Sequence, residues 1–378
     1  MKLNSLILVF GLVLFISCKS KSEKIQNNTA PLKVIANFEE EKALPISDLG
    51  NSIQIVKLDP EITIGKIDRI ITAHDHYYIL DLGYASGLFK FDKQGSLKGK
   101  LLFDLDQKFD FNSITDFYYD GNLILHDGNK GINCVLDRDL NIIEQKRLPF
   151  KANSLRNFEN KLLIFNNYLQ RDWNYDLLVI NKKDLTVEAS YIPVNPDDYG
   201  FHYDSRFTFN MNNEGNQVYF SKAFNDTIYS IDKDFQLSRI FTIDFKDKKV
   251  DKNYLGSGIN ALDLLTSMRN GDFYFTKGEL HFTAANELLM KILKEGKYMN
   301  MLIKEKELNG VIFPVFVDNF KSNYSFHDIL YSDQEKLIFG ASSELLYNNE
   351  QINPSFLNTY TIHPDDNFIL FIVNKEAS

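Results

Sequence analysis

A short strand–turn–strand unit recurs along most of this 378-residue chain, and the repeat constrains the fold more than any other feature. In each copy an apolar run ends in a turn of Asp, Asn, Lys or Gly residues and leads into a second run. Asp and Asn suit a tight hairpin because their side chains bond to the turn backbone and tolerate positive φ. The copies turn at positions separated by 45, 44, 51 and 62 residues, namely Asp92, Asp137, Asn181, Asp232 and, in a weaker form, Lys294.

Four short strands per unit of about 45 to 60 residues are typical of a β-propeller blade. No long stretch shows a helical period. Residues 45–378 therefore predict an all-β fold, a six-bladed β-propeller with four-stranded antiparallel blades. The strand at 52–58 precedes the first full unit, so we expect it to pair with the last blade and close the ring, which removes an open sheet edge. A two-domain β-sandwich is the alternative, although sandwiches rarely keep one hairpin signature at a recurring spacing.

The N-terminus is typical of a secretory signal peptide. Lys2 is followed by eleven apolar residues, 6–16, which are too few for a bilayer span of about 20 residues. Leu14-Phe15-Ile16-Ser17-Cys18 resembles a bacterial lipobox, with Phe15 where that pattern prefers Leu. We therefore predict a signal peptide over 1–17 and a lipid-modified Cys18 that anchors the chain to a membrane. The alternative is an ordinary secretory signal with an incidental cysteine.

The residues after Cys18 predict a flexible tether over 18–44, because they are polar and charged with little periodicity. Lys-Ser-Lys-Ser-Glu-Lys directly after Cys18 is not acidic, which favours a position facing the periplasm. If Cys18 is lipidated, Cys134 has no intramolecular partner. We expect Cys134 to be a small buried hydrophobe on a strand.

Composition excludes several classes of function. The net charge of −9 leaves no basic excess to displace counterions from phosphates, so we expect no nucleic-acid partner. Two cysteines cannot support a disulfide scaffold or a structural zinc site. Catalytic motifs such as Gly-x-Ser-x-Gly, His-Glu-x-x-His and the Walker loop do not occur. We predict no cofactor and no metal.

Three stretches resemble a known family: 225–231 (Asn-Asp-Thr-Ile-Tyr-Ser-Ile), 78–81 (Tyr-Ile-Leu-Asp), and 46–58, which opens with Ile-Ser-Asp-Leu. Their order and spacing resemble the six-bladed β-propeller lipoproteins of Bacteroidota, of the NHL/TolB-like kind. The resemblance implies a propeller fold and a location in the cell envelope, with outer-membrane anchoring. It implies no reaction, because that family carries no established catalytic residues or cofactor.

In a propeller, long irregular connections emerge on the face opposite the hairpins that join third and fourth strands. Loops on a rigid scaffold are where binding usually sits. Aromatic and Arg side chains together suit a sugar face, a peptide or a carboxylate. We therefore predict a ligand surface on this irregular face, formed by Arg171, Trp173, Tyr199, His202, Tyr203 and Arg206. The alternative is that these side chains pack loops against the rim.

Two candidate metal motifs have simpler explanations. His74-Asp75-His76 places two imidazoles at i and i+2, but it lies between two predicted strands and is expected to be an exposed turn. Asp137-Arg138-Asp139 and Asp232-Lys233-Asp234 lack the Gly and closing Glu of a calcium loop, so they are expected to be hairpins.

Two functions remain open from the sequence. The first is a non-catalytic envelope lipoprotein that binds a glycan, a peptide or an envelope protein through its irregular face. The alternative is a propeller hydrolase or lyase, lactonase-like or glycan-cleaving, which needs polar side chains converging in the central channel. The channel candidates lie on or near predicted innermost strands, and they are Asp116, Asn210 and Asp328.

Overall fold

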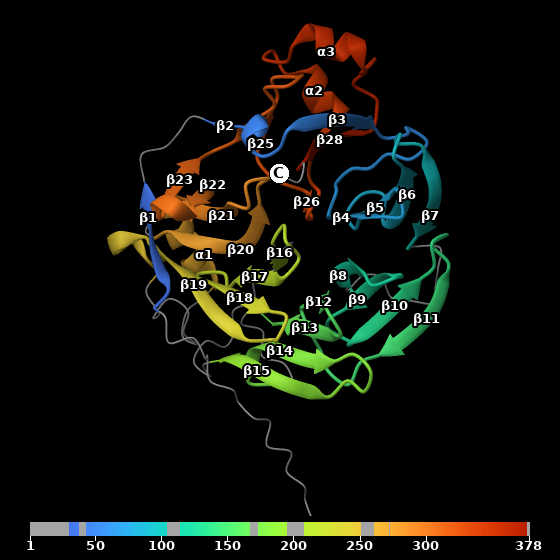
Figure 1. Ribbon diagram of the computed structural model, residues 1–378. Coiled ribbons are helices and arrows are strands. Elements are labelled where there is room, and N and C mark those ends of the chain that lie inside the picture. The colour runs from blue at the N-terminus through green and yellow to red at the C-terminus, as the bar shows by residue number, and fades with distance from the viewer. Residues whose placement is uncertain are drawn as a thin grey trace, which may run out of the picture.

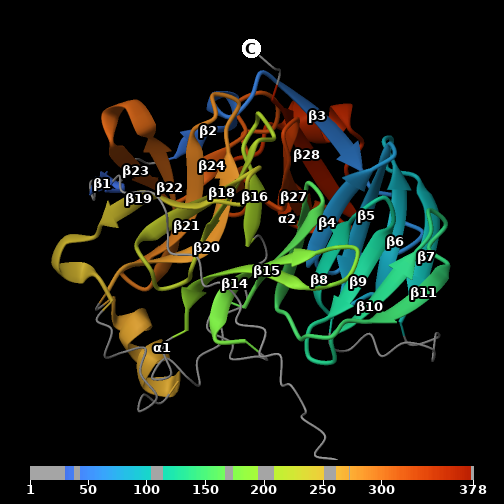
Figure 2. The ribbon, with the colours of Figure 1, turned by 60° about the horizontal axis from the view of Figure 1, so that its bottom comes forward.

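The structure is a computed structural model that describes residues 30–37, 43–103, 114–166, 173–194, 208–250, 261–271 and 273–375. Strands dominate these residues, and the sheets that they form stand around a common centre (Figure 1). Figure 2 shows the same sheets after a turn of 60° about the horizontal axis. The all-β prediction is therefore confirmed.

Three consecutive stretches of chain each form one four-stranded antiparallel sheet, with the strands in sequence order from the centre outward (Figure 1). The first sheet holds β4 (Arg69–Ala73), β5 (His76–Asp81), β6 (Gly87–Asp92) and β7 (Leu97–Leu102). The second holds β8 (Ile114–Tyr119), β9 (Leu123–Asp127), β10 (Ile132–Leu136) and β11 (Ile142–Arg147). The third holds β12 (Ser154–Phe158), β13 (Lys161–Phe165), β14 (Tyr175–Asn181) and β15 (Val187–Pro193).

The last sheet combines the two ends of the described chain. C-terminal strands β26 (Tyr331–Ser332), β27 (Lys336–Ser342) and β28 (Phe368–Asn374) are followed in it by N-terminal β3 (Ser52–Lys57). β28 and β3 run antiparallel, with Ile369 opposite Lys57 and Asn374 opposite Ser52. The pairing expected for the strand at 52–58 is therefore present.

A nine-stranded sheet joins two further four-stranded units through one added strand. One unit is β16 (Phe209–Met211), β17 (Gln217–Ser221), β18 (Thr227–Asp232) and β19 (Leu237–Asp244). The other is β20 (Phe275–Phe282), β21 (Leu288–Lys294), β22 (Lys297–Lys304) and β23 (Asn309–Phe313). Between β19 and β23 lies β1 (Leu32–Asn37), which runs parallel to both.

Strand β1 differs from the sequence prediction, which placed residues 18–44 in a flexible tether. Val34 and Ala36 are buried at 0% and 1% exposure, whereas Ile35 on the other side of the strand is exposed. The apolar residues of this short segment therefore alternate between the core and the surface, and the segment gains its order from two distant strand edges.

The hairpin turns predicted from the repeat join third and fourth strands, as their side-chain hydrogen bonds show. Asp92 Oδ1 accepts hydrogen bonds from the backbone N–H groups of Gln94 and Ser96 at 3.0 and 2.9 Å. Asp137, Asn181 and Asp232 accept equivalent bonds in their own turns.

The prediction of the fifth copy of the repeat, with its turn at Lys294, was wrong. Lys294 ends β21, and the turn that follows joins the second and third strands of its unit rather than the third and fourth. Glu295 and Gly296 form this turn with φ values of 50° and 72°. The third and fourth strands of this unit, β22 and β23, are joined instead by the 3₁₀ helix η6 (Glu305–Glu307), and Leu308 ends this helix with φ 49°. The spacing of 62 residues is irregular because it was measured between two different kinds of turn. Asp232 begins a turn between third and fourth strands, whereas Lys294 begins one between second and third strands.

The hydrophobic core lies between neighbouring sheets. Each of six apolar clusters contains side chains from two sheets or units that follow one another around the centre. Phe89 of the first sheet, for example, shares a cluster with Leu370 of the last. Cys134 is fully buried between the first and second sheets, as the sequence predicted.

Short elements complete the fold. β2 (Leu44–Pro45), β24 (Phe316–Val317) and β25 (Ser325–Phe326) form a small sheet. The helices are α1 (Ala261–Asn270), α2 (Ser343–Tyr347), α3 (Pro354–Thr359) and the 3₁₀ helices η1 (Ile46–Asp48) and η4 (Lys246–Lys248). α2 and α3 lie within the long connection between β27 and β28 (Figure 1). In the described part of the chain, no helix combines the length and the apolar character that a membrane crossing needs.

Candidate functional site

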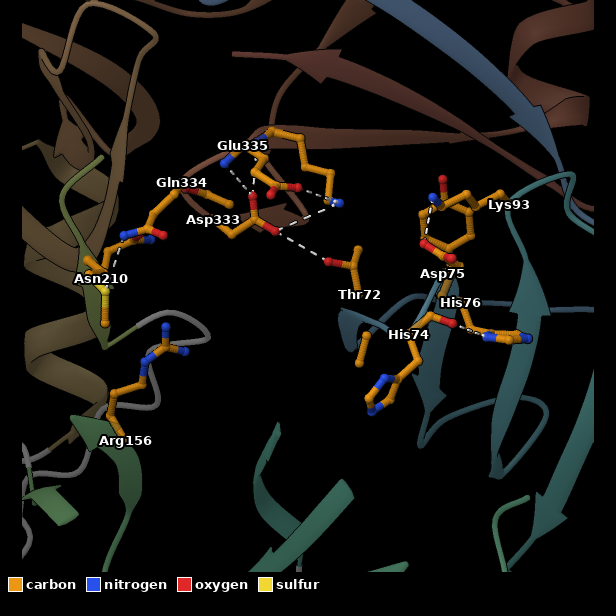
Figure 3. A pocket seen from close by; sticks show the side chains of 15 residues that line it. Thr72, His74, Asp75, His76, Lys93, Arg156, Asn210, Asp333, Gln334 and Glu335 are labelled. Carbon is orange, nitrogen blue, oxygen red and sulfur yellow. Dashed lines mark hydrogen bonds and ion pairs between the residues drawn. The ribbon is translucent and has the colours of Figure 1, made fainter. Parts of the chain in front are cut away.

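Two adjoining hollows lie along the innermost strands. The inner hollow, of about 250 Å³, is lined by residues of β4, β8, β12, β16 and β26, including Arg69, Asp116 and Tyr331. The mouth hollow, of about 370 Å³, is lined by residues of β4, β12, β16 and β26 and by the turns that follow β4 and β26 (Figure 3). Both hollows share Thr72, Arg156, Asn210 and Ser332, so they meet at these residues.

Arg69 and Asp116 line the inner hollow and connect the first three sheets. Arg69 Nη2 lies 3.3 Å from the backbone oxygen of Thr115 and 4.0 Å from Asp116 Oδ1. The Asp116 carboxylate accepts backbone hydrogen bonds from Phe117 at 2.8 Å and from Leu155 of β12 at 2.7 Å. Burial raises the pKa of Asp116, while Arg69 and these hydrogen bonds act in the opposite direction. Asp116 is therefore engaged in holding neighbouring strands.

Other polar groups on the innermost strands also contact the next unit. Ser154 Oγ and Thr208 Oγ1 lie 2.9 Å apart, and Asn210 Nδ2 donates to the backbone oxygen of Leu280 at 2.7 Å. Because unpaired buried polar groups are costly, such contacts make a polar centre compatible with a stable fold.

A hydroxyl group joins the last sheet to the first. Thr72 Oγ1 lies 3.2 Å from the hydroxyl oxygen of Tyr331. It also lies 3.3 Å from Asp333 Oδ2 (Figure 3). Burial, together with the nearby Asp333 carboxylate, raises the pKa of Tyr331. Tyr331 is therefore a neutral hydroxyl at physiological pH, suited to hydrogen bonding with a polar ligand.

The mouth hollow is bordered by the turn between β4 and β5. His74 and Asp75 have φ values of 48° and 64° there, as a tight turn requires. His74 Nε2 contacts the Tyr119 hydroxyl, whereas the ring of His76 lies 2.6 Å from the backbone oxygen of His74. Asp75 pairs with Lys93 at 2.6 Å. The two imidazoles therefore have separate partners, and the described residues contain no cluster of three or more His, Cys, Asp or Glu side chains fit for a metal.

Arg156 of β12 lines both hollows, and Figure 3 shows its side chain in the mouth hollow. No hydrogen bond or ion pair joins its guanidinium to another residue in the described part of the chain. Its positive charge lies close enough to Tyr331 to oppose the rise in the pKa of that hydroxyl.

The residues predicted from sequence have different outcomes. Asp116 and Asn210 line the hollows, but Asp328 does not: it is exposed, and its carboxylate pairs with Lys291 at 2.5 Å. Trp173 is half-buried and packs against the apolar cluster between the second and third sheets. The other predicted ligand residues lie outside the described residues, and they are Arg171, Tyr199, His202, Tyr203 and Arg206.

Sequence reasoning missed Arg69, Thr72, Arg156 and Tyr331. One signal was available: the first strand of several units carries a charged or amide residue, as Arg69, Asp116, Arg156 and Asn210 do. Aligning the units on their first strands would have brought these positions together.

No protein-family model and no curated protein matches this chain. Among solved structures, a Bacteroides fragilis protein named as exported aligns with a TM-score of 0.63 and 14% identity, covering 91% of this chain and 99% of that one. A member of the DUF4221 family from Bacteroides vulgatus aligns with a TM-score of 0.51 and 9% identity, covering 86% and 96% of the two chains. At these identities the likeness concerns the fold alone, and it supports an all-β, β-propeller-like fold for this chain.

Proposed function

We propose that this protein is an exported, lipid-anchored propeller that binds a small polar ligand at the centre of its sheets. One observation carries the proposal: two adjoining hollows of about 250 and 370 Å³ are lined by polar side chains from five innermost strands. Concave sites with a few placed polar groups on a rigid scaffold are where small ligands bind.

We infer that the sheets form a closed ring of six blades, with the nine-stranded sheet counted as two blades bridged by β1. Six apolar clusters between successive sheets and units support this count, including one between the last sheet and the first. The pairing of β3 with β28 supports closure, because it leaves the last sheet built from both ends of the chain.

An envelope location is supported by the signal sequence and by the similarity to a Bacteroides fragilis protein named as exported. We propose anchoring through acylated Cys18 in the outer membrane, with the propeller facing the periplasm. β1 begins at Leu32, 14 residues after Cys18. A fully extended chain spans at most about 3.5 Å per residue, so the propeller would lie within roughly 50 Å of the lipid.

Binding of a glycan, peptide or envelope protein through the irregular face remains part of the proposal. The alternative of a hydrolase or lyase in the channel has less support, because only two of the three predicted channel residues, Asp116 and Asn210, line the hollows. Asp116 is bonded to two backbone N–H groups, and Asp328 lies outside both hollows.

The chain contains a natural reporter for ligand binding. Met211 lines the mouth hollow, whereas Met290, Met299 and Met301 are buried in another apolar cluster. Full-length protein labelled with ¹³C-methyl methionine, held in detergent, is screened by NMR against monosaccharides, amino acids, dicarboxylates and aromatic acids. We expect at least one class to shift the Met211 signal in a saturable way while the three core signals stay in place. If no class shifts Met211, the proposed binding at the centre is wrong.

A further inference from the structure

The charges that line the two hollows are nearly all matched within the protein. Asp75 pairs with Lys93, and Asp116 has two backbone N–H donors with Arg69 nearby. Asp333 accepts hydrogen bonds from the backbone N–H groups of Glu335 and Lys336 at 2.8 and 2.9 Å. Glu335 Oε2 lies 3.9 Å from Lys336 Nζ, so every carboxylate among the described residues that line the hollows has a donor or a cation close to it.

Arg156 is the exception. Its guanidinium has no ion pair or hydrogen bond within the described part of the chain, although it stands between the two hollows. The side chain is half-buried, so water can solvate only part of the charged guanidinium and does not fully make up for the missing ion pair. A guanidinium offers planar donors that match a carboxylate in a bidentate arrangement. The unmatched charge at the centre is therefore positive.

We propose that the ligand of the central site is a small organic anion whose carboxylate binds Arg156, and this inference rests on the proposed function. Neutral groups around Arg156 suit the rest of such a molecule. The Tyr331 hydroxyl, the Thr72 hydroxyl and the Asn210 amide line the inner hollow next to it. The hollows, of about 250 and 370 Å³, have room for a molecule of the size of a monosaccharide acid or an amino acid.

The test compares each carboxylate with its neutral amide. The probes are glucuronate and glucuronamide, benzoate and benzamide, and succinate and succinamide, titrated at constant ionic strength while the Met211 methyl signal is followed. We expect a carboxylate to bind, and its amide to bind at least tenfold more weakly. Arg156→Gln is expected to weaken carboxylate binding roughly tenfold to a hundredfold, because a charge-assisted hydrogen bond is lost. Arg156→Lys keeps the charge but not the planar fork, so its affinity should be intermediate.

Arg239→Gln is the matched control, because Arg239 is exposed on the outer strand β19 and lines neither hollow. It removes the same charge and should leave carboxylate affinity unchanged. Thermal melting of all variants shows whether each is folded. If amides bind as tightly as carboxylates, or if folded Arg156→Gln binds carboxylates as the original protein does, the anion inference is wrong while central binding stands. If neither kind of probe shifts Met211, the proposed function itself is wrong.

Discussion

Replacing Val34 with Ala is expected to lower the free energy of unfolding by about 2–3 kcal/mol. Val34 lies on β1, is fully buried, and belongs to the apolar cluster between the β16–β19 and β20–β23 units. The change removes two methyl groups at about 0.8 kcal/mol each, and the cavity left behind adds to the loss. Residues of β1 pair with β19 on one side and β23 on the other, which limits how far the site can collapse.

Ile35→Ala is the matched control, because Ile35 is the next residue of the same strand and is 56% exposed. Substitutions at such exposed positions usually change stability by less than about 0.5 kcal/mol. Urea denaturation followed by the fluorescence of the single Trp gives both values, and an unchanged m-value shows that the comparison is valid. Equal midpoints for the two variants would refute the docking of β1 and return residues 32–37 to the tether predicted from sequence.

Three further predictions concern stability. Asp116→Ala should cost about 1–3 kcal/mol in urea denaturation, because a buried backbone N–H of β12 loses its acceptor, whereas Asp120→Ala at an exposed ion pair should cost less than about 1 kcal/mol. Gly50→Ala should lower the melting temperature, because the added Cβ would collide with the last backbone oxygen of β28; Gly83→Ala, with open space around it, should have little effect. Burial lowers the pKa of His281 to about 3, so this residue is neutral when folded and takes a proton near pH 6.5 when unfolded. Stability should therefore fall from pH 7 to pH 5, and His281→Gln should reduce that slope by up to about 1.4 kcal/mol per pH unit; an identical slope in the variant would contradict the argument.

Local features of this fold could be predicted from the sequence, and long-range ones could not. The turn at Asp92 was predictable because its side chain bonds to residues two and four positions later. β1 was not, because its partners lie more than 200 residues away and its six residues alone give little periodicity. Lys294 was assigned to the wrong turn because spacing alone does not say which strands a hairpin joins.

The candidate site shows the same division. Asp116 and Asn210 could be predicted because polar residues on a predicted innermost strand are conspicuous. Arg156 was missed, because its five-residue strand taken alone does not distinguish it from an arginine that faces solvent, and only a comparison of the first strands of the units singles it out. Arg156 stands out as a candidate binding residue only once the partners of the surrounding carboxylates are known. Those partners are visible only in the folded protein, where five strands bring the side chains together.

Polar residues at the centre therefore have two separable roles. Asp116, Asn210 and Thr72 bond to the neighbouring sheet or unit, so their loss should reduce stability whether or not a ligand exists. Arg156 bonds to no described residue, so its loss should leave the strand contacts intact and change affinity instead. If the centre were only a water-filled channel, loss of Arg156 would not lower affinity for a ligand, and the two groups of variants would not differ in this way. Unfolding and binding measured on the same set of variants thus distinguish a structural channel from a site built for an anion.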